Sequence, residues 1–181
     1  MPLRYQVLGH PFRDNALYLR VETGKKNHCY LFDCGEKCLD PLSNKTLSEI
    51  DHLFISHFHM DHISGFDRFF RNNYKRPKAV SLSGPEETIR IMKHRFNGFI
   101  WNLVDGQPGE WRINELRTRS IRKAIFYPAD RFSKIHHRHT IKSSGLLIEN
   151  KDLIIRYMIL DHKTPVAGFI VREKAKWNIN K

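Results

Sequence analysis

The chain has 181 residues, a formal net charge of +12 at pH 7 and three cysteines. Its length suits one domain that can bury about 70% of its unfolded surface. No apolar run approaches the ~20 residues that span a bilayer, and residues 1–5 lack the apolar core of a signal peptide. We therefore expect a cytoplasmic protein with no membrane contact, and reduced cysteines rather than a disulfide framework.

The positive charge favours a polyanionic partner. Basic residues gather in residues 68–78, 112–123 and 131–142. Nucleic acid is the first partner to consider for such a chain, although charge alone does not separate RNA from DNA or from a phosphorylated metabolite. A solvated basic surface without a binding role is the alternative.

Short strands open the chain. The clearest alternates apolar side chains through Leu17, Leu19 and Val21, and another ends at Asp33. We expect strands at residues 5–9, 16–23, 29–32 and 53–55, with a helix end at 48–51 before the last one.

Four metal-capable side chains follow directly after the strand at 53–55. His57, His59, Asp61 and His62 form the pattern His-x-His-x-Asp-His. Imidazoles and a carboxylate are the usual ligands of zinc and other borderline divalent metals, and one such cluster can serve two adjacent ions in hydrolysis. Apolar spacing predicts a helix behind this loop, over residues 63–70. A polar loop with surface histidines is the alternative.

The remaining elements predict a mixed α/β or α+β sandwich. We expect a helix at residues 86–96 and strands at 78–82, 111–127, 144–149, 153–160 and 166–172. His162 follows one of these strands in the way that His57 follows 53–55. If both strand ends meet at one edge, His162 lies beside His57 and His59, and three imidazoles plus one water make an open hydrolytic zinc site. An ordinary loop histidine is the alternative.

Two further groups are possible metal sites. The tract His136–His139 is interpreted as a basic loop or strand that touches RNA phosphate, because adjacent strand residues point to opposite faces. Cys34 and Cys38 are interpreted as reduced thiols. The tryptophans at 101, 111 and 177 are expected in or against the core.

The histidine motif is similar to the signature of the metallo-β-lactamase superfamily. Three other segments, in the family's order, resemble motifs of its ribonuclease Z branch, the tRNA 3′-processing endonucleases. Residues 32–36 place Asp33 at a strand end, residues 83–85 contain a Gly-Pro after a strand, and residues 161–171 place His162 before a Pro and a Gly-aromatic strand.

The resemblance implies a role for each of these residues. His57, His59 and His162 would hold one zinc ion, whereas Asp61 and His62 would belong to a second ion, with Mn²⁺ or Fe as other possible metals. Asp61 would also act in catalysis, and Asp33 would fix a ligand histidine by hydrogen bonding. No separate cofactor-binding residues are implied.

The family fold is an αββα sandwich of two similar halves, whose bridging Asp and final His come from the second half. The printed sequence ends at Lys181, soon after the third motif, and both Asp130 and Asp152 precede His162. We therefore expect one metallo-β-lactamase-like domain over residues 1–181, the N-terminal half to two-thirds of the fold, incomplete at its C-terminus. A homodimer or a complementing C-terminal half would complete it.

The function implied is a zinc-dependent phosphodiester hydrolase that cleaves RNA at the 3′ end of a tRNA precursor, using metal-activated water. A hydrolase of the same fold that acts on a small phosphodiester or ester is one alternative. A non-catalytic RNA-binding or regulatory half-domain is the other.

Overall fold

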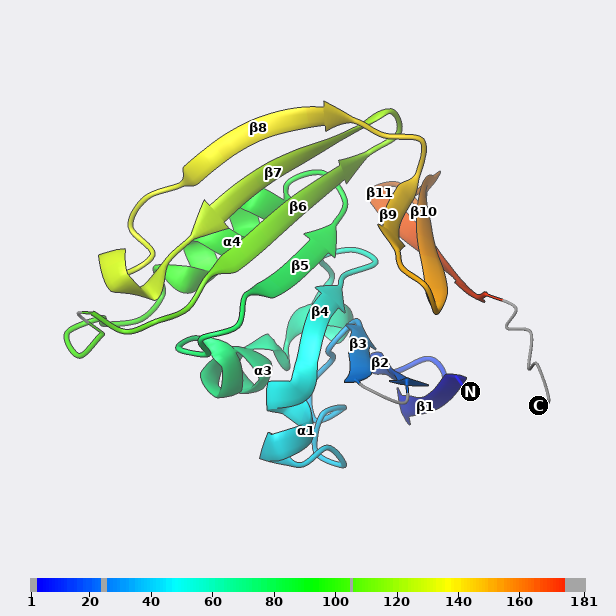
Figure 1. Ribbon diagram of the computed structural model, residues 1–181, viewed down its shortest axis with the longest axis horizontal. Helices are drawn as coiled ribbons and strands as arrows, with labels where there is room; N and C mark the ends of the chain where they lie inside the picture. Colours follow the sequence, from blue (N-terminus) through cyan, green and yellow to red (C-terminus); the bar gives the residue numbers. More distant parts are fainter. Residues whose placement is uncertain (1–2, 24–25, 105, 175–181) are drawn as a thin grey trace, which may run out of the picture.

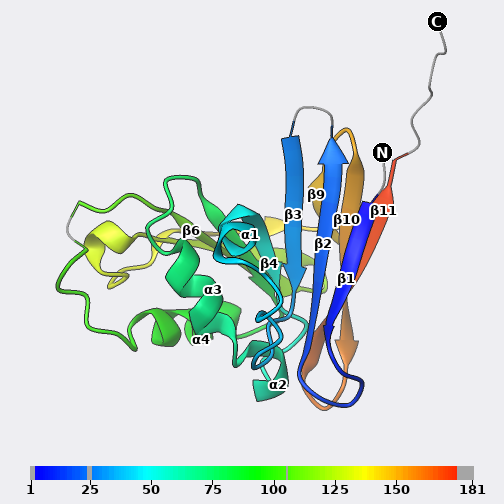
Figure 2. The same ribbon diagram turned by 90° about the horizontal axis from the view of Figure 1, so that it is seen from below.

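Two β-sheets face each other, and helices cover the outer side of the larger sheet (Figure 1, Figure 2). The computed structural model describes residues 3–23, 26–104 and 106–174. The larger sheet contains, in spatial order, β1 (Leu3–Gly9), β2 (Asn15–Thr23), β3 (Lys26–Phe32), β4 (Ile50–Phe54), β5 (Val80–Gly84), β6 (Trp111–Arg117), β7 (Ser120–Phe126) and β8 (His136–Lys142). The smaller sheet contains β11 (Pro165–Glu173), β10 (Leu153–Asp161) and β9 (Leu146–Glu149).

The helices lie between strands of the larger sheet in the sequence. They are α1 (Asn44–Glu49), α2 (Met60–Ile63), α3 (Phe66–Asn73), α4 (Thr88–Phe96) and the short 3-10 helix η1 (Pro128–Asp130). None of the described helices is long and apolar enough to cross a membrane.

Strand direction decides where the site can form. Strands β3, β4, β5 and β6 pair in parallel, whereas all other pairs are antiparallel. The carboxyl ends of these four strands therefore meet at one edge of the larger sheet, here named the carboxyl edge. Open sheets of parallel strands present their binding residues at such an edge.

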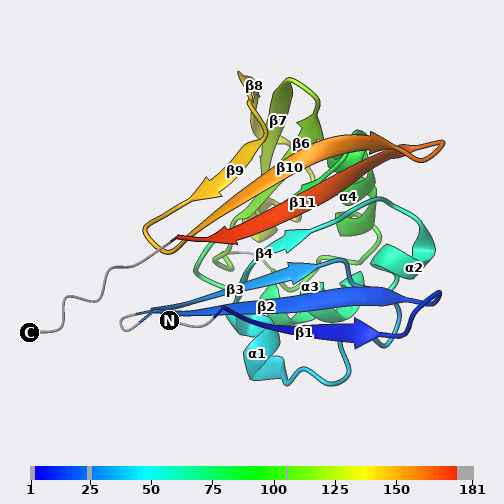
Figure 3. The same ribbon diagram turned by 90° about the vertical axis from the view of Figure 1, so that its right-hand side faces the viewer.

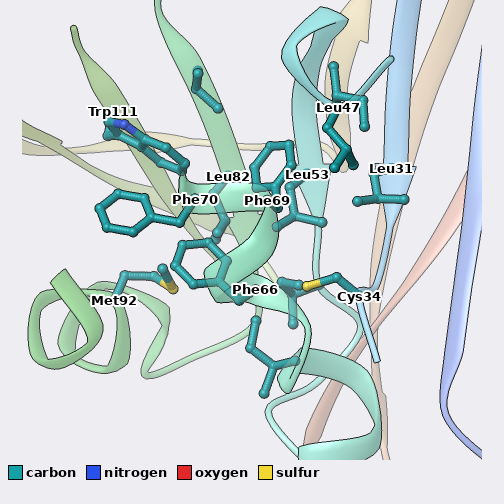
Figure 4. Packing of buried hydrophobic residues seen from close by; sticks show 14 of the residues in the cluster. Leu31, Cys34, Leu47, Leu53, Phe66, Phe69, Phe70, Leu82, Met92 and Trp111 are labelled. Carbon is teal, nitrogen blue, oxygen red and sulfur yellow. The ribbon is translucent and has the colours of Figure 1, made fainter. Parts of the chain in front are cut away.

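Helix α3 buries one face against the larger sheet. Phe66, Phe69 and Phe70 recur at helical spacing and are at most 2% exposed. Their rings lie 5.0–6.1 Å from the ring of Trp111 on β6, centroid to centroid (Figure 4). This packing anchors α3, and with it the loop that connects β4 to the helix layer.

A second apolar cluster fills the space between the sheets. Phe54 points into it, whereas Leu53 points to the helices, because successive strand side chains alternate. The Phe54 ring lies 5.1 Å from the ring of Phe169 on β11. The Tyr157 hydroxyl donates a 2.8 Å hydrogen bond to the carbonyl oxygen of Arg117. These contacts hold the β10–β11 hairpin over the carboxyl edge.

The predicted strands are confirmed, with shifts of a few residues at their ends, and the fold is α+β as expected. The prediction of one helix over residues 63–70 is wrong in detail, because the chain forms α2 and α3 with a break at Ser64 and Gly65. The 111–127 segment is the β6–β7 hairpin, and the histidine tract lies on β8. Trp101 and Trp111 contact or join the core, whereas Trp177 lies outside the described residues.

Apolar side chains stay exposed on β1 of the larger sheet and on the outer face of the smaller sheet. Tyr5 and Val7 share the face of β1 that carries Leu3 toward the inter-sheet cluster, yet they are 68% and 67% exposed. In Figure 3, β1 lies to one side of β11 rather than behind it. Within the described residues, β11 has a neighbour on one edge only. On the outer face of the smaller sheet, Met158 and Ile170 are about half exposed.

His52 is a buried histidine outside the site. Its ring stacks on Phe54 at 4.0 Å, and its Nε2 lies 2.7 Å from Ser83 Oγ. Burial lowers the pKa of His52 from 6.5 to about 3. The unfolded chain therefore binds this proton first, so the contribution of neutral His52 to stability is complete above pH 6.5 and is lost as the pH falls toward about 3.

A His52→Gln variant keeps a hydrogen-bonding group at this position but has no proton to gain. Between about pH 7 and pH 5, we expect the native chain to lose roughly 2 kcal/mol more of its free energy of unfolding than the variant loses. Urea unfolding at the two pH values measures this difference. Equal losses in both proteins would contradict a neutral, buried His52.

Candidate metal centre

The site lies at the carboxyl edge of the larger sheet. Asp33 follows β3, Ser56 and His57 follow β4, and α2 carries Asp61 and His62. The β10–β11 hairpin reaches the same place from the smaller sheet, and the Ala167 amide donates a 2.8 Å hydrogen bond to the carbonyl oxygen of Ser56. Both sheets therefore contribute to one site.

The sequence-predicted ligands come together as two pairs. His57 Nε2 lies 3.1 Å from His59 Nδ1, and His62 Nε2 lies 3.3 Å from Asp61 Oδ2. Two donor atoms bound to one tetrahedral zinc at 2.0–2.1 Å lie about 3.3 Å apart. The His57 and His62 ring centroids are 4.1 Å apart, so the pairs are adjacent. The donor set and its spacing fit two neighbouring borderline divalent ions.

His162 lies close to these pairs but farther out. It is an exposed residue of the β10–β11 hairpin, and its ring centroid is 6.4 Å from that of His57. Across the described residues, no group of three or more His, Cys, Asp or Glu side chains is close enough together to hold one metal ion. The two donor atoms of each pair thus lie as far apart as two ligands of one ion. The His162 side chain would have to turn inward to join them.

Asp33 organises the site through three hydrogen bonds. Its carboxylate accepts from the Ser56 amide at 2.7 Å, from the Ser56 hydroxyl at 2.8 Å and from His62 Nδ1 at 2.8 Å. The backbone of Asp33 is left-handed, with a φ of 54°. This costly conformation aims the carboxylate at the β4 loop. Gly35 allows the close approach that follows, because a Cβ there would lie 2.4 Å from the Asp61 carbonyl oxygen.

The hydrogen bonds of Asp33 determine which histidine nitrogens carry no proton and can therefore donate a lone pair. A carboxylate only accepts, so His62 Nδ1 carries the proton and Nε2 is left to face Asp61. The Ser56 hydroxyl gives its proton to Asp33 and lies 3.1 Å from His57 Nδ1, so that His57 Nδ1 donates to the hydroxyl oxygen. His57 Nε2 then carries no proton, and it faces His59. Such outer hydrogen bonds fix tautomer and ring orientation in metal sites.

Two pKa shifts accompany this geometry. Burial is the main reason that the pKa of His57 is lowered, and the neighbouring histidines lower it further. The neutral imidazole, which is the form that binds a metal, is therefore favoured. The hydrogen bond to Asp33 is the main reason that the pKa of His62 is raised.

Ser56 is the residue whose role the sequence reasoning missed. It directly precedes His57 in the histidine motif segment. Its hydroxyl contacts Asp33, His57 and His62 at once, the last at 3.2 Å. A hydroxyl residue directly between a strand and the first ligand histidine was the available signal.

The histidine tract and the cysteines contribute no side chain to the ligand pairs. His136 Nε2 bonds to Asp130 Oδ2 at 2.5 Å, and His139 is exposed on β8. Cys34 and Cys38 are free and buried, and burial raises their thiol pKa values. These cysteines are core residues in their protonated form.

A family model described as anti-Pycsar protein Apyc1 matches residues 10–161. Ribonuclease Z from Deinococcus radiodurans is 37% identical over 175 residues, covering 96% of this chain and 53% of that protein. Ribonuclease Z from Synechococcus sp. is 28% identical over 166 residues, covering 88% and 43%. The chain therefore spans about half the length of the curated relatives it matches.

Solved structures agree on the fold. Human tRNase Z, short form, superposes with a TM-score of 0.54 at 18% identity, covering 94% of this chain and 64% of that one. The metallo-β-lactamase fold protein YhfI from Bacillus subtilis has a TM-score of 0.56 at 13% identity, covering 94% and 57%. The predicted metallo-β-lactamase fold is confirmed, and the chain covers 64% and 57% of these two structures.

The resemblance to the ribonuclease Z branch, inferred from the motifs, is confirmed as well. With 152 of its residues, 10 through 161, matched by the family model, the chain belongs to the family of anti-Pycsar protein Apyc1, within the metallo-β-lactamase fold.

Proposed function

We propose that the chain carries the metal-binding part of a zinc-dependent phosphodiester hydrolase that cleaves RNA at the 3′ end of a tRNA precursor. The observation that carries this proposal is the pair of donor-atom spacings, His57 Nε2 to His59 Nδ1 and His62 Nε2 to Asp61 Oδ2. The relatives named ribonuclease Z support the choice of reaction. The net charge of +12 supports a polyanionic RNA substrate.

In this proposal His57, His59 and His162 hold one ion, and Asp61 and His62 bind the second. Zinc suits these ligands best, and Mn²⁺ or Fe are also compatible with them. Bound metal would supply Lewis acidity at the phosphodiester and activate water for attack on phosphorus.

The chain's own groups prepare the centre for this chemistry. Asp33 holds the Nδ1 proton of His62 directly and orients the ring of His57 through the Ser56 hydroxyl. His57 is buried and excludes water from one side of the centre. The Asp61 side chain is 48% exposed, so its carboxylate is open to the substrate side, which supports its assignment as a catalytic residue.

A small phosphodiester is the second candidate substrate. The family model that matches most of the chain carries a name other than ribonuclease Z, which supports keeping a second candidate within the same fold. The ligands and the attacking water would be unchanged.

The remaining ligands would come from a complementing β-segment. The open edge of β11, the exposed Tyr5 and Val7 beside it, and the exposed outer face of the smaller sheet support this proposal. Residues 1–181 would then be one part of a single domain, completed by further chain or by a second copy in a homodimer. A cytoplasmic location agrees with reduced, buried cysteines.

Removal of one ligand tests the metal centre. A His59→Ala variant should bind less zinc. Its hydrolytic activity should fall by more than the roughly 10–100-fold that loss of an outer hydrogen-bond partner typically costs. Metal analysis and hydrolysis of a bis-aryl phosphodiester measure both effects, with exposed His94→Ala as the matched control. Hydrolysis that survives His59→Ala unchanged refutes the mechanism.

Cleavage of a precursor tRNA by the native chain, compared with the bis-aryl substrate, separates the two candidate functions. Metal content separates the forms of the centre, because about two ions per chain indicate a complete centre and about one indicates the three-histidine site. A folded sample that binds no zinc would exclude the proposed function.

Loss of the Ser56 hydroxyl should loosen both pairs of ligands. We expect Ser56→Ala to weaken zinc binding roughly tenfold or more, since outer-shell partners typically contribute that much. Ser56→Thr keeps the hydroxyl and should restore most of the affinity. Competition with a chelator measures affinity, and urea unfolding of the metal-free proteins checks stability. Native-like affinity in Ser56→Ala would show that the hydroxyl has no such role.

The exposed inner face of β1 should drive association. We expect the native chain to form dimers or larger species in size-exclusion chromatography, because large open apolar patches associate in water. A Tyr5→Ser/Val7→Ser variant should associate less, whereas Gln6→Ser, from the other face of β1, should not change. A well-behaved native monomer at high concentration argues against a complementing segment.

A further inference from the structure

The carboxyl edge continues beyond the metal centre into a row of cations. Strand β6 ends at Arg117, the turn at residues 118–119 leads into β7, and Lys142 at the end of β8 lies opposite Ser120. The β10–β11 hairpin adds Lys163, directly after His162. We name Arg119, Lys142 and Lys163 the cationic rim.

Arg119 of the rim shares a cavity with the hairpin that carries His162. A cavity of about 400 Å³ is lined by Arg117 and Arg119 from the larger sheet and by Ile159 and Pro165 from the hairpin that carries His162. The Ser143 amide also donates a 3.0 Å hydrogen bond to the carbonyl oxygen of Arg119, which ties the end of β8 to the β6–β7 turn. The rim and the centre therefore belong to one continuous edge.

The charges of the rim are available to a ligand. Arg119, Lys142 and Lys163 are exposed, and in the part of the chain that the structure describes they form no ion pair. Arg117 differs, because it bridges Glu86 at 2.6 Å and Glu115 at 3.1 Å. Several cations of the helix layer are paired in the same way: Arg68 with Asp40, Arg76 with Asp51 and Arg95 with Asp67.

Position decides what kind of anion the rim can take. Strands lie about 4.8 Å apart, so the start of β7 and the end of β8 lie about 14 Å and 19 Å from the end of β4, which His57 follows. A small phosphodiester at the centre would not reach Lys142. A polymer with a repeating phosphate, running along the edge from the centre, would meet the rim cations in succession.

We propose that the cationic rim binds the phosphate backbone of RNA on one side of the phosphodiester that the metal centre would cut. The proposal rests on the proposed function for the identity of the polymer. Contacts of this kind position a nucleic acid without reading its sequence. They make affinity steeply dependent on salt, and each phosphate contact adds about 0.7 to the slope for single strands.

Salt-dependent binding of RNA tests the rim. Fluorescence anisotropy of a labelled single-stranded RNA is measured with the full chain from about 50 to 200 mM KCl, with chelator present to keep the RNA intact. An Arg119→Ala/Lys142→Ala variant should lose two contacts, lowering the slope of log K against log salt by about 1.4. The fall in affinity across that range should then shrink roughly sevenfold.

Two matched variants keep the result interpretable. Lys45→Ala/Arg71→Ala removes two exposed cations from α1 and α3 and should bind RNA as the native chain does. Arg119→Lys/Lys142→Arg keeps both charges and should retain the native slope. A rim variant with native slope and affinity overturns the proposal, as does equally strong binding of the native chain to poly-glutamate.

Hydrolysis of the bis-aryl phosphodiester separates this proposal from the proposed function. The Arg119→Ala/Lys142→Ala variant should hydrolyse that substrate at the native rate, because a small substrate does not reach the rim. A native chain that hydrolyses this substrate but binds no RNA contradicts RNA binding by the rim and still supports phosphodiester hydrolysis at the centre. A native chain that shows the expected rim effect on RNA binding without hydrolysis supports the rim and contradicts the catalytic proposal.

Discussion

The rest of the candidate centre depends on the hydrogen bonds that the Asp33 carboxylate accepts. It accepts hydrogen bonds from the Ser56 amide, the Ser56 hydroxyl and His62 Nδ1, and it reaches them from a left-handed backbone at the end of β3. Through these bonds one negative charge orients two imidazoles, one directly and one through a hydroxyl. Both Nε2 atoms are then left facing the neighbouring candidate ligands, so these hydrogen bonds already orient the donor atoms of the candidate centre.

This arrangement is possible because parallel strands end together. Asp33 and His57 follow neighbouring parallel strands, and the apolar residues of α3 hold the intervening loop against the sheet. The hairpin with His162 comes from the other sheet and is held by the Tyr157 hydroxyl and by the inter-sheet cluster. The precision of the pairs therefore comes from two cores, one on each face of the larger sheet, whereas His162 depends on the inter-sheet core alone.

The same sheet edge carries the candidate ligands and the unpaired cations. The candidate ligand pairs lie where β3 and β4 end. The unpaired cations lie in the β6–β7 turn, at the end of β8 and in the hairpin that carries His162. A charged polymer that follows the edge would pass from one to the other. The open face around Tyr5 and Val7 lies on β1, at the opposite end of the strand order, so a complementing segment there would leave the cations accessible.

The sequence by itself predicted the candidate ligands and determined the family resemblance and most strands, because the motif is local and strand side chains alternate with a period of two. It did not separate α2 from α3, since the apolar spacing continues across the break at Gly65. Only the tertiary structure decided that Ser56 links two histidines and that Arg119 shares a cavity with the His162 hairpin, because strand pairing between distant segments creates those contacts.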